Sequence, residues 1–317
     1  MSVDARLTRR KALLAGGGAV GALALANVPA RASSTPRKQR GHLPAAAIQS
    51  IVGIEGTVSS GVLGMSPERK DIGTVRGPQG VHFPPSFELN GDLYFQPLGS
   101  DLAFFNGDIA LKASELNPVV DAIDANGLVF QAMHQHYFDL DPMVWFIHFR
   151  GTGEPLALAR AVRRVLEATA TPLPQKSPAH PKTPLNHGAL ARTLGGSSEI
   201  GDAGVVTVTI NRSDTIVIGD VEVSPETNVS TNVEFLPLDR AGTRAAVAPD
   251  FSMRTPEVPR VCKAMRAAGF EIGCLYNQET GGHPQLYFAH MLSTGDPQAL
   301  AVKIRAALDL THSDRPS

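Results

Sequence analysis

The sequence predicts an α+β protein built from two copies of one folding unit. Residues 106–167 align with residues 248–309 at a constant offset of 142 without a gap, and 17 of the 62 aligned positions are identical. Repeats of this kind indicate a tandem duplication. Each copy also alternates helical apolar spacing with strand-like hairpins. We therefore predict two β-α-β-β-α units, each ferredoxin-like with extra strands, packed about a pseudo-twofold axis.

The repeated block sets the order of elements. Apolar residues recur at i, i+3, i+4 and i+7 from Leu116, which predicts a helix at 115–126 and its counterpart at 257–268. Thr255-Pro256 is expected to start the second helix, and Gly127 and Gly269 are expected to end the pair in left-handed conformation. Strands are expected at 93–96, 102–111, 128–137 and 143–150, and at 233–236, 244–253, 270–276 and 285–291. Together they predict an antiparallel or mixed sheet covered by helices on one face.

The first 32 residues have the pattern of a cleaved export signal. Arg9-Arg10 precede a short apolar stretch and the small-residue cleavage motif Ala30-Arg31-Ala32. The paired arginines indicate twin-arginine export, which predicts a periplasmic or extracellular protein that begins near Ser33. A membrane anchor is the alternative, but the apolar stretch is shorter than the roughly 20 residues of a span. No transmembrane span is expected in the mature chain.

Composition divides the mature chain into segments and argues against one class of binding partner. The expected parts are a flexible lead-in at 33–44, repeat unit 1 at 45–169, a linker with five prolines at 170–188, repeat unit 2 at 189–310 and a tail at 311–317. Beyond residue 32 the chain has 24 basic and 29 acidic residues. Nucleic-acid binding, which needs a basic face, is not expected.

The turns at 151–155 and 293–297 precede helices but lack a P-loop lysine and a nucleotide-binding glycine pattern. We expect Glu154 and Asp296 to cap those helices, and we expect no nucleotide cofactor. Two cysteines, Cys262 and Cys274, are expected as small buried apolar residues. A disulfide between them is the alternative in an oxidising compartment.

Three histidines of the first copy form the candidate site. His134 and His136 are two residues apart in a predicted strand, so their side chains share one face. If the hairpin is symmetric about Pro142, His136 lies opposite His148. Three imidazoles can hold a divalent metal such as zinc and leave a position open for water. Such a water could serve as the nucleophile in a metal-assisted hydrolysis.

A fourth ligand, His82, is remote in sequence, and Glu222 takes its place in the second copy. Asp108 and Asp250 could orient the histidines, although a strand-end role is equally open. The second copy is expected to be degenerate, because it has different groups at two of the three histidine positions: Tyr276, Gln278 and His290. The alternative is that the first two histidines decorate a solvated face and that the third, identical in both copies, is structural.

Several motifs in order resemble the LppY/LpqO-type exported bacterial proteins, a family with a duplicated domain of unknown function. They are residues 106–111 (NGDIAL), 115–119 (ELNPV), 132–136 (AMHQH) and 145–149 (WFIHF). The resemblance implies an exported protein and no established reaction. This sequence departs from the family pattern in having Gln135 for the usual Asn, Tyr276-Asn277-Gln278 for a second H-N-H, and no lipid-bearing cysteine after the signal.

Two functions fit these observations. The first is an exported metal-binding protein with one histidine site in the first copy, acting in hydrolysis. The second is a non-catalytic envelope protein that binds a small ligand or partner between the two repeats. An enzyme would also need a general base near the metal, and no residue in the sequence is marked as that base.

Overall fold

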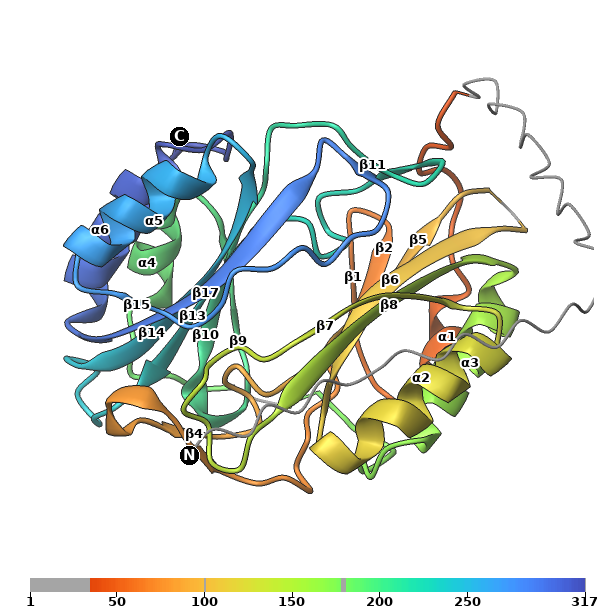
Figure 1. Cartoon of the computed structure of the whole chain (residues 1–317), viewed down its shortest axis with the longest axis horizontal. Helices are drawn as coiled ribbons and strands as arrows, with labels where there is room; N and C mark the ends of the chain where they lie inside the picture. The colour runs from red at the N-terminus through yellow and green to blue at the C-terminus, as the bar shows by residue number, and fades with distance from the viewer. Residues whose placement is uncertain (1–34, 100, 178–180, 317) are drawn as a thin grey trace, which may run out of the picture. The chain divides into compact units, whose positions relative to one another are not determined.

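The structure is a computed structural model that describes residues 35–99, 101–177 and 181–316. The predicted export signal lies outside these residues. The chain from Thr35 onward forms one compact unit. It contains two six-stranded antiparallel sheets, one in each half (Figure 1). In the part of the chain that the structure describes, no helix is long and apolar enough to cross a membrane.

The sheet of the first half has the strand order β1-β2-β5-β6-β8-β7. Its strands are β1 (Thr57–Ser59), β2 (Val62–Met65), β5 (Asp92–Pro97), β6 (Ala103–Leu111), β7 (Val129–His134) and β8 (Trp145–Gly153). The helices are α1 (Ala45–Val52), α2 (Leu116–Ala125) and α3 (Pro155–Glu167). A separate two-stranded ribbon consists of β3 (Val75–Arg76) and β4 (His82–Phe83).

The second half repeats this plan with the order β15-β17-β14-β13-β10-β9. Its strands are β9 (Ser197–Ile200), β10 (Val206–Ile210), β13 (Thr231–Pro237), β14 (Ala245–Arg254), β15 (Glu271–Ile272) and β17 (Leu286–Gly295). The helices are α4 (His187–Leu194), α5 (Val258–Ala267) and α6 (Pro297–Leu308). A small sheet joins β11 (Ile216–Ile218), β12 (Val221–Val223) and β16 (Gly282–His283). The predicted α+β protein with two similar halves is confirmed.

The apolar cores show how the helices and the two sheets are layered. Ile48, Val119 and Val162, from α1, α2 and α3, belong to one core with the first sheet, and α4, α5 and α6 share a second core with the other sheet. A third core contains residues of both halves, including Phe146 and Leu292. The opposite faces of the two sheets therefore meet, with helices outermost (Figure 1).

Strand alternation decides where the histidines point. Along β8, Ile147 and Phe149 enter the core under the helices, so the residues between and before them face the other way. Phe146 accordingly lies in the core between the sheets. The same alternation on β17 buries Met291 under the helices. It directs His148 and His290 between the two sheets.

The structure corrects the predicted hairpin register. β7 ends at His134, and an irregularity between Phe130 and Ala132 shifts the pairing with β8. Ala132 is therefore the partner of His148, and Phe146 is the partner of His134. His136 lies in a bend beyond the strand, so the expectation that it pairs opposite His148 was wrong.

The structure confirms some of the predicted helix ends and corrects one. Gly127 and Gly269 have φ values of 68° and 92°, as the predicted left-handed ends require. The side chain of Glu154 accepts hydrogen bonds from the backbone N–H groups at the start of α3, and that of Asp296 from one at the start of α6. Both predicted caps are confirmed. The predicted start at Thr255-Pro256 was wrong: α5 begins at Val258.

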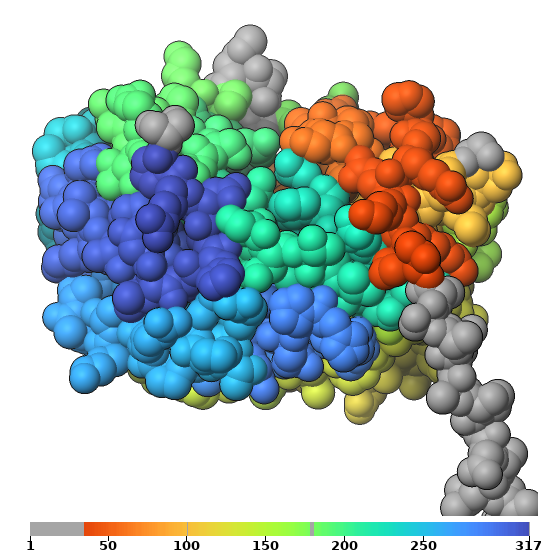
Figure 2. Space-filling model, turned by 90° about the horizontal axis from the view of Figure 1, so that it is seen from above, coloured from red at the N-terminus to blue at the C-terminus, as the bar shows by residue number. Residues whose placement is uncertain are grey.

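Segments expected to be loose also make backbone contacts. Within the lead-in, Arg37 forms an isolated bridge with Val221 and Arg40 forms one with Leu98. Figure 2 shows this face, with the first described residues (red-orange) beside the green-to-teal part of the second half. In the proline-rich stretch, the Gln175 backbone bonds with Gly53 O and with Glu55 N.

Candidate functional site

A cavity of about 50 Å³ lies between the two sheets. This space is large enough for a metal ion with a few waters or for a small reacting group, since one water needs roughly 10–15 Å³. Both halves line it with polar side chains almost throughout: Glu88, Asn90, Asp92, Asp108, His136, His148, Asn228, Asn232, Glu234, Asp250, Tyr276, Gln278 and His290.

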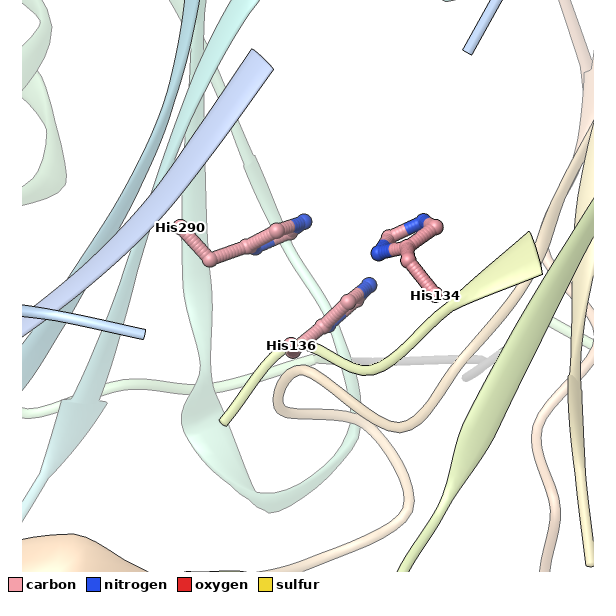
Figure 3. A group of neighbouring side chains, drawn as sticks. All are labelled: His134, His136 and His290. Carbon is pink, nitrogen blue, oxygen red and sulfur yellow. The ribbon is translucent and has the colours of Figure 1, made fainter. Parts of the chain in front are cut away.

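Three buried histidines converge beside this cavity. His134, His136 and His290 each offer one ring nitrogen, and these atoms all lie within 4.8 Å of one another. The first two come from the end of β7 and the bend after it, and the third comes from β17 of the other half (Figure 3). Each residue is at most 7% exposed. The group is therefore shared between the two halves.

Ring stacking holds the histidines in place. The His136 ring lies with its centroid 3.5 Å from that of His290 on one side and 3.5 Å from that of Phe146. His134 stacks on Tyr276 at 3.6 Å. Rings of the first and second halves thus pack face to face, which restricts their rotation and fixes the direction of their nitrogens.

Hydrogen bonds orient two of the rings. Nε2 of His134 lies 2.9 Å from Nε2 of His148, while Nδ1 of His134 is buried without a partner among the described atoms. Glu88 Oε2 lies 2.9 Å from His290 Nδ1 and 3.3 Å from His136 Nδ1, the latter without hydrogen-bond geometry. A metal-binding histidine is typically held in this way through its other nitrogen.

Burial keeps three of the histidines neutral. It lowers the pKa of His136 to about 4, with the nearby His290 adding to the effect and Glu88 opposing it. Burial and then His136 and His290 lower the pKa of His148 to about 3. Burial and His148 also lower the pKa of His134 well below its usual value. Metals bind neutral imidazole, so these rings are in the required state near pH 7.

His290 differs because carboxylates surround it. Burial alone would lower the pKa of His290, but Asp250 and Glu88 outweigh burial and raise it. Burial raises the pKa of Asp250 to about 6 despite His290, whose Nε2 lies 3.7 Å from Asp250 Oδ2. Burial also favours the acid form of Glu88, but His290 and His136 lower the pKa of Glu88 to about 2. In the metal-free protein Glu88 and His290 therefore form a buried ion pair, and a metal that binds His290 would have to displace one of its ring protons.

Further carboxyl groups lie on the other side of the cavity. Burial raises the pKa of Asp92 to about 6, and burial together with Asp92 raises the pKa of Asp108 well above its usual value. Asp108 pairs in register with His148, as Asp250 does with His290. The two halves thus present equivalent aspartate–histidine pairs to one cavity.

The low pKa of His136 predicts a pH effect on the metal-free protein. The unfolded chain takes up a proton on His136 below pH 6.5, whereas the folded protein does so only below about pH 4. The contribution of neutral His136 to the free energy of unfolding is therefore present above pH 6.5 and is lost as the pH falls from 6.5 to about 4. The stability of wild type relative to His136→Gln should fall by roughly 2 kcal/mol between pH 7 and pH 4.5. Urea unfolding at both values measures it. The stability of wild type relative to the control His82→Gln, at an exposed histidine, should not change in this way. An equal change relative to both variants would contradict the prediction.

The structure brings some of the predicted residues together and separates others. His134, His136 and His148 lie in one cluster. His82 does not join it: Phe83 fills the core between the sheets, so strand alternation leaves its neighbour exposed. Glu222 pairs with Lys38 at 3.0 Å and does not line the cavity. The two cysteines are free and half-buried.

Sequence reasoning missed the residues that the second half supplies. The second copy, with His290, was expected to be a degenerate site of its own, and a structural role for His148 and His290 was the alternative. The structure instead places Tyr276, Gln278 and His290 around the same cavity as the first-copy histidines. Glu88 carried no sequence signal, because it lies outside the repeated block.

Comparisons with known proteins identify a domain family. A family model described as "Domain of Unknown Function (DUF1259)" matches residues 46–168 and again residues 188–310. A search of curated proteins finds no significant match. Two solved structures match at 9% identity: the trimeric bacterial microcompartment shell protein PduB, covering 81% of this chain and 91% of that one, and EtuB from Clostridium kluyveri, covering 84% and 98%. Their TM-scores are 0.21 and 0.20, too low to bear on fold or function.

Proposed function

Because this chain belongs to the family described as Domain of Unknown Function (DUF1259) and carries that domain twice, we propose that the two copies together form one metal site. His134, His136 and His290 are the proposed ligands and zinc is the proposed metal. The observation that carries the proposal is the convergence of three buried ring nitrogens within 4.8 Å. Bonds of 2.0–2.1 Å in a tetrahedral site put nitrogens about 3.4 Å apart, so the ring nitrogens need to approach by up to about 1.4 Å.

The surroundings of the three rings support this assignment. His148 holds one nitrogen of His134 and Glu88 holds one nitrogen of His290. The other nitrogen of His134 has no partner among the described atoms, and that of His290 lies 3.3 Å from the Tyr276 hydroxyl, which a metal would displace. Glu88 also supplies negative charge beside the ligands. A site with three protein nitrogens keeps a position open for water, and the adjoining cavity provides the room.

We propose metal-assisted hydrolysis as the reaction class. A zinc held by these residues would lower the pKa of a bound water to about 7 and make it a nucleophile. Asp250 is the proposed general base: its Oδ2 lies 3.5 Å from the Tyr276 hydroxyl, and its pKa of about 6 suits proton transfer near neutral pH. Asp250 would accept the proton that water loses as its oxygen bonds to the electrophilic centre, and would return this proton to the leaving group as the bond to that group breaks.

Metal content of the purified protein tests the site. Wild type should bind about one zinc per chain, while His134→Ala and His136→Ala should each weaken zinc binding by more than about 100-fold, since even an outer partner of a ligand is worth 10–100-fold. The matched control is His82→Ala, an exposed histidine outside the cluster, which should bind zinc as wild type does. Elemental analysis and a zinc titration provide the measurement. Equal zinc content in all four proteins would overturn the proposal.

The second function is non-catalytic binding of a small ligand between the two repeats. The small size of the cavity favours it, because about 50 Å³ admits only a small group. Zinc-loaded wild type that retains its metal but hydrolyses no activated carboxylic or phosphoric ester would support this function. Turnover that disappears in Asp250→Asn, with zinc content unchanged, would support hydrolysis.

We also propose that the protein is exported by the twin-arginine route, in keeping with its resemblance to LppY/LpqO-type proteins. The support is Arg9-Arg10 and the motif at residues 30–32. Replacing both arginines with lysine should leave the protein in the cytoplasm with its first 32 residues attached. Cell fractionation and N-terminal sequencing measure this. Unchanged export of the double variant would rule out the twin-arginine route.

We propose further that each repeat, at 45–169 and 189–310, is a ferredoxin-like unit with added strands and that a pseudo-twofold axis relates them. The first point is supported by the split β-α-β order, since β8 lies between β6 and β7 and β17 lies between β14 and β15. The second is supported by the equivalent aspartate–histidine pairs that meet at one cavity.

A further inference from the structure

We propose that a groove beside the metal cavity binds the substrate of this site, and that the substrate is an organic cation bearing one or more amines. The groove lies between residues 54–70 of the first half and residues 199–207 of the second. The role of the groove as a substrate site rests on the proposed metal site. The positive charge of its ligand is argued independently of that site.

The groove adjoins the cavity at two residues. Asn90 and Glu234 line both spaces. The groove has a volume of about 420 Å³, within the usual range for a small-molecule site. The cavity beyond it contains the His136 ring, which is 7% exposed and whose Nδ1 lacks a hydrogen-bond partner among the described atoms. A ligand in the groove therefore lies beside the cavity that contains one of the proposed metal ligands.

The charge of the lining selects the ligand. Four carboxylates line the groove against two lysines, and they are Glu55, Glu68, Glu199 and Asp202. Burial and the nearby Glu88 raise the pKa of Glu234 well above its usual value, so this fifth acidic residue favours its neutral form. Lys70 is held by Glu68 at 3.3 Å and by Asp202 at 3.1 Å, so it contributes little free positive charge. The groove concentrates cations and repels anions.

The rest of the lining excludes other ligand classes. Among the described residues that line the groove there is no arginine, the usual partner of phosphate and carboxylate ligands. There is also no aromatic side chain on which a sugar ring or base could stack. Apolar patches from Ile54, Met65 and Ile200 instead suit the methylene groups of an alkylamine.

Spermidine serves as the probe, with glutarate as an anionic control of similar flexibility. Calorimetry at low salt on the metal-free protein should show binding of spermidine and none of glutarate. Glu199→Gln should weaken spermidine binding about fivefold. The matched control is Glu271→Gln, an exposed carboxylate on β15 away from the groove, which should leave binding unchanged. Equal affinity for the two probes, or equal effects of the two variants, would overturn the proposal.

A second measurement connects the groove with the metal. With cobalt(II) loaded in place of zinc, the bound spermidine protons should relax faster than in the zinc protein, because the paramagnetic ion lies next to the groove. Unchanged relaxation with cobalt bound would overturn the role of the groove as the substrate site. If the protein binds no metal, the proposed function fails while the calorimetry still decides whether the groove binds cations.

Discussion

Replacing His290 with alanine should weaken zinc binding by more than about 100-fold, as much as the loss of a histidine from the first half. The reason is that the β17 ring completes the group of three nitrogens, stacks on His136 at 3.5 Å and holds the Glu88 carboxylate at 2.9 Å. Competition with a chromophoric chelator measures the affinity. A loss of this size would mean that the two halves share one site.

The matched control is His283→Ala, an exposed histidine of the same half on β16, which should bind zinc like wild type. Circular dichroism establishes that both variants remain folded. If His290→Ala kept the wild-type affinity while His134→Ala lost it, the site would belong to the first half alone. The shared site proposed above would then be wrong.

The second large effect concerns a buried ion pair that both halves contain. Arg69 makes two hydrogen bonds with Glu115, at 2.8 and 2.9 Å, and also donates to the Ala110 carbonyl. Its side chain is 1% exposed. Replacing it with methionine leaves the Glu115 carboxylate without its main partner, which should reduce the free energy of unfolding by about 3–5 kcal/mol. Urea unfolding measures the loss.

The same loss of stability is expected when the equivalent ion pair of the second half is broken. Arg212 bonds with Glu257 at 3.1 and 3.3 Å and donates to the Ser252 carbonyl, so Arg212→Met should cost about as much. Arg160→Met is the control, since Arg160 is half-exposed and lies 3.6 Å from Glu154, and it should cost less than about 1 kcal/mol. Similar losses in all three variants would show that the buried pairs have no special role.

These pairs also indicate how far the sequence alone could lead. The constant offset of the repeat equates Glu115 with Glu257, and both residues make the same ion pair at the first turn of a helix. Apolar spacing located α2 and α5, because burial under the sheet requires one apolar face, whereas α1 and α4 were not predicted. As a rule, residues identical in both copies of a repeat are expected to be structural, and the paired roles of Glu115 and Glu257 agree with this rule.

The same rule failed at the site. His148 and His290 are identical by position, yet β17 brings the second of them into a group with first-copy histidines. Strand alternation could show that the two histidines face away from the helices, but not that this face meets the other half. The sharp end of β7 and the two-residue strand β15 were missed as well, because contacts between the halves override local strand propensity there.

The stack of His136 against His290 has a consequence for assembly of the protein. The two rings are far apart in the chain, so the stack forms only when the last strand of the second half has docked on the first half. Contacts between such distant segments come late in folding, because the intervening chain must be ordered first. Metal capture would then be among the final events of maturation, and the zinc content of a preparation would report the fraction of chains that have folded to completion.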